Sequence, residues 1–381
     1  MTDRYSPLHP THVAAGAGFT DFAGWQMPVR YSSDLAEHHA VRTAAGLFDL
    51  SHMGEIIVIG LEAADALDYA LSGRLSAIAV GQAKYSLLLG RDGGILDDLV
   101  VYRTGDDRFM VVANASNREV VFAELLERCA PFEAEVFDES DDLALIAVQG
   151  PLSRRILTET NGFLVEGGHP DGRDFAETLA AEKYYRAFAG SFRGHPVLVA
   201  RTGYTGEDGF ELYLGPTAAP ELWDALMEVG SPLGLVPAGL ASRDTLRLEA
   251  GMPLYGHELG IDVYPVQAGL ARVVVLDKKD FVGRDAVVKG PPAGARVLVG
   301  LAGLGKRAAR ADYEVFASET STEPIGVITS GALSPTMGFP IAMAFVDASA
   351  ATPGAELSVD IRGNRLPLSV TTLPFYSRKK D

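Results

Sequence analysis

A series of short runs rich in β-branched residues constrains the fold of this chain most strongly. The strand-like runs span residues 55–59, 85–89, 99–103, 109–113, 143–148 and 196–200. Amphipathic helical patterns span residues 34–45, 62–70, 117–128, 152–157 and 221–228. Because the strands do not alternate one for one with long helices, and no fixed period recurs, the sequence favours neither a doubly wound parallel sheet nor a solenoid. The sequence therefore predicts an α+β protein with mostly antiparallel sheets.

A stretch rich in Gly, Pro and Ala divides the chain near its last quarter. The chain has 381 residues, enough for two or three domains with separate cores. Residues 289–295, Lys-Gly-Pro-Pro-Ala-Gly-Ala, have the composition of a linker. Short strand-like runs and turns follow to the end, without a convincing helix. We therefore expect a separate C-terminal β-domain.

Local signals predict where two of the helices begin. Ser116 and Glu119 have the spacing of a capping box, in which each side chain satisfies a backbone amide of the first turn. This pair predicts a helix that begins at Asn117. A second helix is expected to open at Ser242.

The charge balance and the cysteine content limit the partners and the compartment. Lys and Arg number 33 against 50 Asp and Glu, a net charge of −17, which would repel a phosphate backbone. We therefore expect no nucleic acid partner. The single cysteine, Cys129, cannot close an intrachain disulfide, and the first residues lack the pattern of a signal peptide, so we predict a cytoplasmic protein. No apolar run approaches the roughly 20 residues of a membrane span.

Three familiar site patterns fail on inspection. Gly300–Lys306 has the spacing of a phosphate-binding P-loop, but Arg307 stands where Ser or Thr should reach Mg²⁺, and no amphipathic helix follows. The eight histidines show no zinc-ligand spacing, so we predict no metal. Cys129 has no nearby His and is expected to be a buried thiol rather than a nucleophile.

Residues 201–212 gather three glycines, three acids, a Tyr and an Arg directly after an apolar strand. The glycines allow the backbone to turn and to approach another group closely. If Glu211 faces a cleft, its carboxylate can accept two parallel hydrogen bonds from a flat heterocycle with adjacent N–H donors. The alternative is a structural β-hairpin whose acids are solvated.

Two further clusters contain charged residues that could face a ligand. Asp97 and Asp98 stand where a turn enters an apolar strand, and because neighbouring strand residues face opposite ways, only one of them can point at a given pocket. Asp98 could position or exchange a proton with an amine, whereas Asp97 is better explained as a turn cap. Arg243 lies in the first turn of a helix, where the dipole disfavours a cation, so it faces either a ligand or an acid such as Asp244.

These clusters, together with Phe22–Pro28 and Leu47–Gly54, closely resemble the aminomethyltransferase, or T protein, family of the glycine cleavage system. The resemblance covers essentially the whole chain, with the motifs in register. It implies three lobes. A discontinuous N-terminal lobe (1–51 and 141–285) would bind folate, an inserted ferredoxin-like lobe would span 52–140, and a C-terminal β-barrel would span 286–381.

The same resemblance implies the reaction and the site. Tetrahydrofolate would bind in a central channel and receive a one-carbon unit from the aminomethyl-lipoyl group of the H protein, giving 5,10-methylenetetrahydrofolate, ammonia and the dihydrolipoyl carrier. Asp98 matches the catalytic acid beside the reacting nitrogens. The folate-binding matches are Glu211 at the pterin edge, Arg243 in the pterin-side pocket, Asn114 as a polar contact, Tyr85 and Tyr204 beside the ring, and Met53 in the wall.

Some features depart from the family pattern or stay open. Ala241–Ser242 replaces the Gly-Ala that commonly precedes the Arg-Asp pair. The cations Arg378, Lys379 and Lys380 could contact the anionic glutamyl tail of folate, or form a solvated terminus. Two other functions remain: a related tetrahydrofolate-dependent demethylase, with a similar folate pocket and a different donor, and a folate-binding protein without catalysis.

Overall fold

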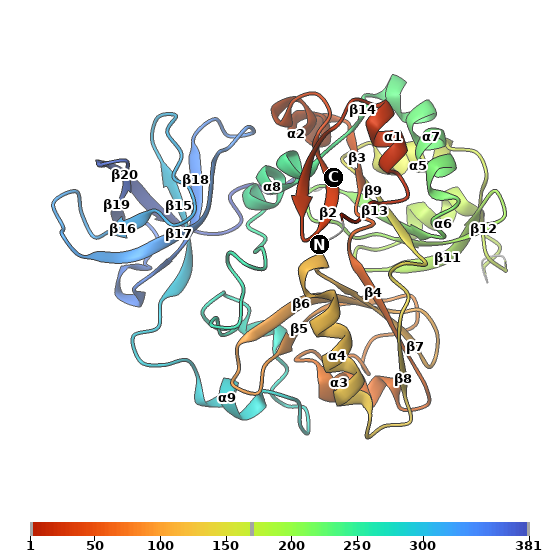
Figure 1. Ribbon diagram of the computed structural model, residues 1–381, viewed down its shortest axis with the longest axis horizontal. Coiled ribbons are helices and arrows are strands. Elements are labelled where there is room, and N and C mark those ends of the chain that lie inside the picture. Colours follow the sequence, from red (N-terminus) through yellow and green to blue (C-terminus); the bar gives the residue numbers. More distant parts are fainter. Residues whose placement is uncertain (1–2, 168–170, 379–381) are drawn as a thin grey trace. The chain divides into compact units, whose positions relative to one another are not determined.

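The computed structural model describes residues 3–167 and 171–378, which form two compact units (Figure 1). Unit 1 comprises Met1–Ala70, Arg74–Tyr85 and Leu99–Arg243; unit 2 comprises Leu71–Gly73, Ser86–Asp98 and Asp244–Asp381. This division follows the chain differently from the three predicted lobes, whose boundaries stay a prediction.

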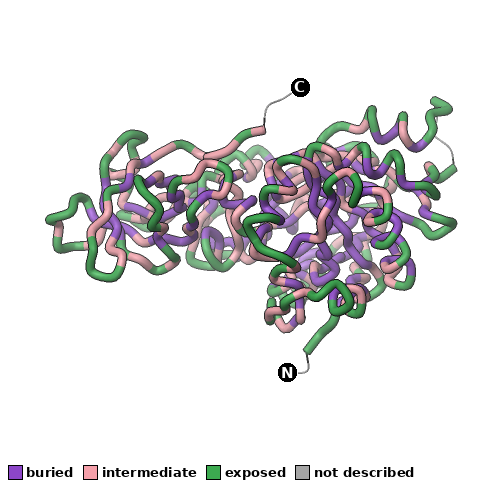
Figure 2. The backbone as a smooth tube through the Cα atoms, turned by 90° about the horizontal axis from the view of Figure 1, so that it is seen from above, coloured by how far each residue is buried: buried purple, intermediate pink, exposed green. Residues whose placement is uncertain are grey.

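A seven-stranded sheet forms the centre of unit 1. Its strands run in the order β10 (Phe163–Val165), β11 (Ala187–Phe192), β12 (His195–Ala200), β13 (Gly209–Leu214), β9 (Ala144–Gln149), β3 (Ala45–Asp49) and β14 (Leu235–Pro237). All neighbours pair antiparallel except β14 and β3. Strands β3 and β9 are buried along their whole length. Figure 2 shows the buried stretches of the chain in purple.

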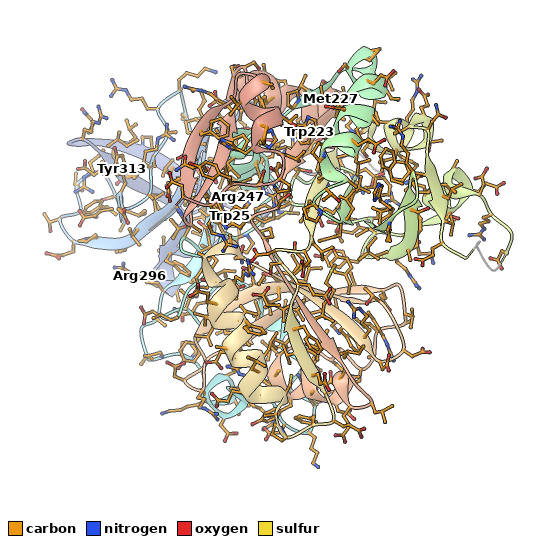
Figure 3. The ribbon with its side chains drawn as sticks, turned by 45° about the vertical axis from the view of Figure 1, so that its right-hand side comes forward. Trp25, Trp223, Met227, Arg247, Arg296 and Tyr313 are labelled. Carbon is orange, nitrogen blue, oxygen red and sulfur yellow. The ribbon has the colours of Figure 1, made fainter. Side chains whose placement is uncertain are left out.

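Three helices provide the apolar cover of this sheet. They are α5 (Ser153–Glu159), α6 (Phe175–Ala181) and α7 (Ala219–Gly230). Their core residues include Leu157, Leu179 and Leu222, and these share one buried cluster with Phe210 and Leu212 of β13. Trp223 of α7, labelled in Figure 3, belongs to the same cluster. Side chains on the opposite face of β13 are therefore left for other contacts.

A five-stranded sheet has the order β5 (Ala83–Leu89), β6 (Ile95–Arg103), β7 (Arg108–Ala113), β4 (Gly54–Ile59) and β8 (Glu135–Asp138). Helices α3 (Ala63–Ala70) and α4 (Arg118–Cys129) pack against each other, with Leu67, Val121 and Leu125 buried. Cys129 is buried at the end of α4, and burial raises the pKa of its thiol to about 11. The thiol is therefore not an activated nucleophile, as the sequence predicts.

A hairpin and three further helices complete the elements before the second unit. The hairpin strands are β1 (Gly18–Phe22) and β2 (Trp25–Arg30), and the helices are α1 (His9–Ala14), α2 (Asp34–Thr43) and α8 (Leu240–Glu249). Ala23 and Gly24 both have positive φ, 54° and 82°, which matches the twist that a two-residue hairpin turn requires.

Unit 2 contains a closed β-barrel. Its strands follow one another as β15 (Val297–Gly303), β18 (Pro340–Val346), β17 (Pro324–Leu333), β16 (Glu314–Phe316), β19 (Glu356–Ile361) and β20 (Asn364–Thr371). Leu301, Val315, Ile328, Ala344 and Val359 are among its core residues. The predicted C-terminal barrel and the antiparallel α+β class are thereby confirmed. Before the barrel, α9 (Arg284–Lys289) ends where the predicted linker begins.

The six strand-like runs and five helical patterns all correspond to observed elements, but two helix starts were wrong. Helix α4 begins at Arg118, and its N-cap residue, Asn117, makes no side-chain cap bond. Ser116 instead lies in a 3₁₀ turn, Ala115–Asn117, and its hydroxyl donates to Asn117 Oδ1 at 3.2 Å. The capping box is therefore absent. Helix α8 begins at Leu240, two residues before Ser242.

None of the helices within residues 3–167 and 171–378 is both long and apolar enough to cross a bilayer. The same residues contain no group of three or more His, Cys, Asp or Glu side chains that could hold a metal ion.

Candidate active site

Glu211 lies at the centre of strand β13, on the face away from the main core. The register alternates Phe210 and Leu212 into the apolar cluster with Glu211 and Tyr213 on the other face. Glu211 is half-buried, whereas Tyr213 is 3 % exposed. The carboxylate of Glu211 therefore lies on the face of β13 that points away from the apolar cluster.

The two carboxylate oxygens of Glu211 differ in their hydrogen bonds. Oε2 accepts a hydrogen bond from Thr202 Oγ1 at 2.5 Å and from the Tyr102 hydroxyl at 3.3 Å. Burial raises the pKa of Tyr102 well above its usual value, and the charge of Glu211 raises it further, so the phenol stays protonated. Oε1 has no hydrogen-bond partner in the described part of the chain. The carboxylate is thus oriented, with an oxygen left to accept.

Arg243 brings an incompletely satisfied cation to the same region. Its guanidinium carbon lies 4.9 Å from the centroid of the Tyr204 ring, a cation–π contact. Its Nη1 atom is buried and has no partner among the residues that the structure describes. Burial lowers the pKa of Arg243, while the charge of Glu211 acts in the opposite direction. Arg243, Tyr204 and Glu211 therefore form one site in unit 1.

Met53 and Asn114 lie at one end of a strand pair. Met53 directly precedes β4 and Asn114 directly follows β7, and the register pairs Gly54 with Ala113. Both predicted residues are half-buried and are therefore brought to the same end of the sheet. Tyr85, on β5, is also half-buried.

His52 is a neighbour of this site that sequence reasoning did not single out. It is 3 % exposed, its Nδ1 atom has no partner within the described residues, and the Phe22 ring lies 5.3 Å from it edge to face. Burial lowers the pKa of His52 to about 4, the charge of Asp49 opposes this, and the charge of Arg243 lowers it further. The imidazole is therefore neutral at pH 7. The sequence signal that could have identified His52 is its position directly before Met53 in the motif Leu47–Gly54.

Asp98 lies in unit 2, on strand β6. It is half-buried, whereas the adjacent Asp97 is fully buried. Burial raises the pKa of Tyr255, and the charges of Asp97 and Asp98 raise it further, which places this phenol near both acids. Asp97 is the third residue of β6, and its role as a turn cap stays a prediction.

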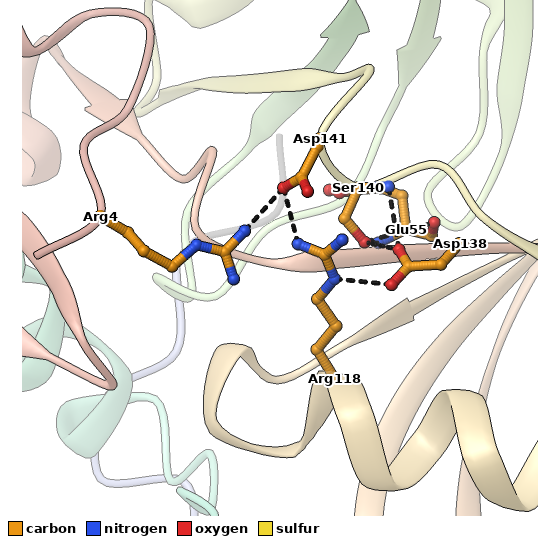
Figure 4. Close-up of polar contacts among 6 residues, drawn as sticks. All are labelled: Arg4, Glu55, Arg118, Asp138, Ser140 and Asp141. Atoms are coloured by element: carbon orange, nitrogen blue, oxygen red, sulfur yellow. Dashed lines mark hydrogen bonds and ion pairs between the residues drawn. The ribbon is translucent and has the colours of Figure 1, made fainter. Parts of the chain in front are cut away.

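A cavity of about 470 Å³ lies elsewhere in unit 1, lined by residues that include Arg4, Trp25, Ser51 and Asp141. Figure 4 shows Asp141 Oδ1 between two guanidiniums, at 2.6 Å from Arg4 Nη2 and 2.8 Å from Arg118 Nη1. None of the seven predicted site residues lines this cavity. The ion pairs at its rim are exposed at Asp141 and are therefore weak.

Comparison with known proteins decides the family. Residues 8–278 match the family model of the GCVT N-terminal domain, and residues 296–377 match that of the glycine cleavage T-protein C-terminal barrel domain. The chain belongs to the glycine cleavage T-protein family of aminomethyltransferases. The resemblance inferred from the motifs is thereby confirmed, and with it the assignment of the chain as a glycine cleavage aminomethyltransferase.

Relatives in this family match from end to end. The chain is 56 % identical over 382 residues to an aminomethyltransferase of Cutibacterium acnes, covering 99 % of each chain. It is 52 % identical to the aminomethyltransferase of Corynebacterium jeikeium, covering all of both. The crystal structure of the glycine cleavage system aminomethyltransferase T from Bartonella henselae superposes with a TM-score of 0.86 at 36 % identity, covering 98 % of each chain.

The individual site assignments and the tail stay predictions. Arg378 is described and half-buried, but Lys379 and Lys380 lie outside the described residues.

Proposed function

We propose that this aminomethyltransferase transfers the one-carbon unit of an aminomethyl-lipoyl group, carried by the H protein, to tetrahydrofolate. The products would be 5,10-methylenetetrahydrofolate, ammonia and the dihydrolipoyl H protein. The family membership supports the transferase activity, and the incompletely bonded side chains of Glu211 and Arg243 support folate as the acceptor. We propose the cytoplasm as the compartment, because the free Cys129 suits a reducing environment.

The unfilled hydrogen-bonding groups of unit 1 support the proposal. A pterin edge presents adjacent N–H donors, which suit a carboxylate with a free oxygen, and a carbonyl oxygen, which suits a guanidinium N–H. Glu211 Oε1 and Arg243 Nη1 are such groups. A buried donor without a partner costs about 1 to 3 kcal/mol, a cost that a bound ligand would remove. This complementarity is the observation on which the folate assignment rests.

Asp98 is proposed as the acid that acts on the reacting groups. The transfer breaks the carbon–sulfur and carbon–nitrogen bonds of the aminomethyl thioether. The same carbon forms two new bonds, one to each folate nitrogen. Of the two N–H protons that these nitrogens lose, one goes to the sulfur and one to the leaving –NH₂ group, which departs as ammonia. A carboxylate can hold the cationic amine or carry one of these protons. Positioning both substrates can supply about 7 to 11 kcal/mol of barrier reduction.

The test combines tetrahydrofolate, an aminomethyl-loaded lipoyl H protein and the enzyme, and measures ammonia and methylenetetrahydrofolate together. We expect equimolar release that depends on folate. Folate-independent release, or none, would overturn the proposal. Methylated folate formed from a methylated amine or thioether, with no ammonia, would assign the chain to the demethylases.

Two variants separate binding from chemistry in this assay. Glu211→Gln should weaken folate binding by about 1.5 to 3 kcal/mol, because the charge-assisted bonds are lost. Asp98→Asn should lose roughly 10²-fold in turnover while its folate affinity changes little, because an amide cannot exchange the proton. Titration calorimetry and steady-state rates measure both. Asp97→Asn is the matched control, and a larger turnover loss there than at Asp98 would contradict the assignment.

A further inference from the structure

A chain of buried hydrogen bonds in unit 1 begins at the loop that follows β3. Asp49 Oδ1 accepts from the backbone N of Ser51 at 2.9 Å. Asp49 Oδ2 accepts from the Ser6 hydroxyl and lies 2.8 Å from His12 Nε2. The Ser51 hydroxyl in turn accepts from the backbone N of Leu145 at 3.1 Å. The carboxylate of Asp49 therefore fixes the backbone of the loop that leads to His52 and Met53.

His12 and Tyr31 carry the chain onward. The Tyr31 hydroxyl lies 2.9 Å from His12 Nδ1. Burial raises the pKa of Tyr31, and the charges of Asp49 and Glu37 raise it further, so the phenol keeps its proton and donates to Nδ1. His12 can then hold its own proton on Nε2 and donate it to Asp49. Burial raises the pKa of Asp49, but the bonds from His12, Ser6 and Ser51 outweigh this and lower it.

Glu37 connects this chain to the helix that carries Arg243. Its Oε1 accepts from the backbone N of Tyr31 at 2.7 Å and of Ser32 at 3.0 Å. Its Oε2 accepts from the backbone N of Gly239 at 2.9 Å. Glu37 is fully buried, and a single carboxylate thus receives three backbone donors.

Gly239 transmits this constraint to the first turn of α8. Its carbonyl accepts from the Ser242 hydroxyl at 2.9 Å and from the backbone N of Arg243 at 3.1 Å. A Cβ on Gly239 would lie 2.4 Å from the carbonyl carbon and oxygen of Val29, so the residue packs directly on strand β2. The start of α8 is therefore held both by packing and by Glu37.

We propose that Glu37 and Asp49 are positioning residues whose buried relay holds Arg243 and Met53 in one fixed arrangement, so that the pterin pocket is assembled before the ligand arrives. A pocket formed in advance avoids the cost of ordering its side chains on binding. The inference rests on the proposed folate site and adds residues that do not themselves touch the ligand.

Glu37→Gln is the sharpest test, because the amide keeps the size of the side chain. Its oxygen can serve Tyr31 and Ser32, which leaves the NH₂ group facing the N–H of Gly239, a contact between two donors. We expect the dissociation constant of tetrahydrofolate to rise about tenfold while kcat at saturating folate changes less than twofold. In an Arg243→Met background the same change should cost nothing further, because no guanidinium remains to be positioned.

The controls separate positioning from general stability. Asp68 also accepts backbone N–H bonds, from Leu75 and from Ser76, the latter at 3.1 Å. Asp68→Asn therefore matches the loss of the charge and of one acceptor oxygen without touching α8. It should leave folate affinity unchanged. If Glu37→Gln does not fold, Ser242→Ala removes the hydroxyl bond to the Gly239 carbonyl at the start of α8 and should show the same coupling to Arg243 at about fivefold.

The possible outcomes are distinct. Equal losses of folate affinity in the wild-type and Arg243→Met backgrounds, or no loss in either, would overturn the relay. Wild-type protein that does not bind tetrahydrofolate would instead overturn the proposed function.

Discussion

Helix α8 carries two arginines one turn apart, Arg243 and Arg247, which differ in their hydrogen-bond partners. Arg247 is 1 % exposed and donates to Asp244 Oδ1 at 2.7 and 2.8 Å, to Glu258 Oε2 at 2.9 Å and to the Ser330 hydroxyl at 2.8 Å. Figure 3 labels this residue. Arg243, in the first turn, has a buried Nη1 atom without a partner in the described chain.

The difference separates a structural cation from a binding cation. A buried charge is tolerated in a folded core when acids and hydroxyls neutralise it, as they do at Arg247. A buried donor without a partner in the protein can donate to a bound ligand instead, and we interpret Arg243 Nη1 in this way. Two arginines on one helix thus have different roles, and their hydrogen-bond partners distinguish the structural arginine from the binding one.

The largest expected effect is on stability, at Arg247. Arg247→Met leaves the fully buried Glu258 without its cation, which should lower the free energy of unfolding by about 3 to 5 kcal/mol. Urea unfolding of the purified protein measures the change. Arg193→Met is the control, because its pair with Glu221 is exposed and should be worth less than about 1 kcal/mol. A loss at Arg247 no larger than at Arg193 would remove the structural half of the comparison.

The next effect concerns the pH dependence of stability near Arg243. The pKa of His52 is about 4 in the folded protein, whereas a histidine outside the folded surroundings has a pKa of 6.5. As the pH falls, the unfolded chain therefore binds the proton before the folded protein does. Stability should therefore decrease from pH 6.5 to pH 4, by about 3 kcal/mol from this residue alone. Urea unfolding across this range should show a shallower decrease for His52→Gln. Identical pH profiles for the two proteins would contradict the assignment.

The smallest free-energy change is expected for folate binding at Arg243. Arg243→Met should weaken tetrahydrofolate binding by about 1.5 to 3 kcal/mol, because a charged hydrogen bond to the ligand is lost. The free energy of unfolding should stay the same or rise, since no buried partner is orphaned. Titration calorimetry and urea unfolding give the two values. A variant that loses stability and keeps its folate affinity would reverse the roles of the two arginines.

Local sequence patterns predicted the regular elements, because strand and helix periodicity depends on residues a few positions apart. The runs at 55–59 and 109–113, for example, lie within the paired strands β4 and β7. The hairpin β1–β2 was missed, since its burial does not alternate. The start of α4 was wrong because a 3₁₀ turn competes with the capping box for Ser116.

The site was predictable only where its residues are close in sequence or carried by a family motif. Glu211 and Thr202 are nine residues apart in the glycine-rich cluster at residues 201–212, and the backbone turns within this cluster so that the two side chains form a hydrogen bond. The bond between Glu37 and Gly239 joins residues 202 positions apart, which no local pattern encodes. The complete burial of Asp97 likewise depends on tertiary packing, which no local pattern encodes.

The strand order of the large sheet has a consequence for synthesis on the ribosome. Strand β3 pairs with β9 on one side and with β14 on the other, and Leu235 of β14 follows its partner Ala45 by 190 residues. At a synthesis rate of roughly 5 to 20 residues per second, about 10 to 40 seconds pass between the synthesis of β3 and that of β14, its last neighbour. During that time an apolar strand edge stands open to other nascent chains. The open strand edge is therefore a liability of the growing polypeptide, before the enzyme has folded.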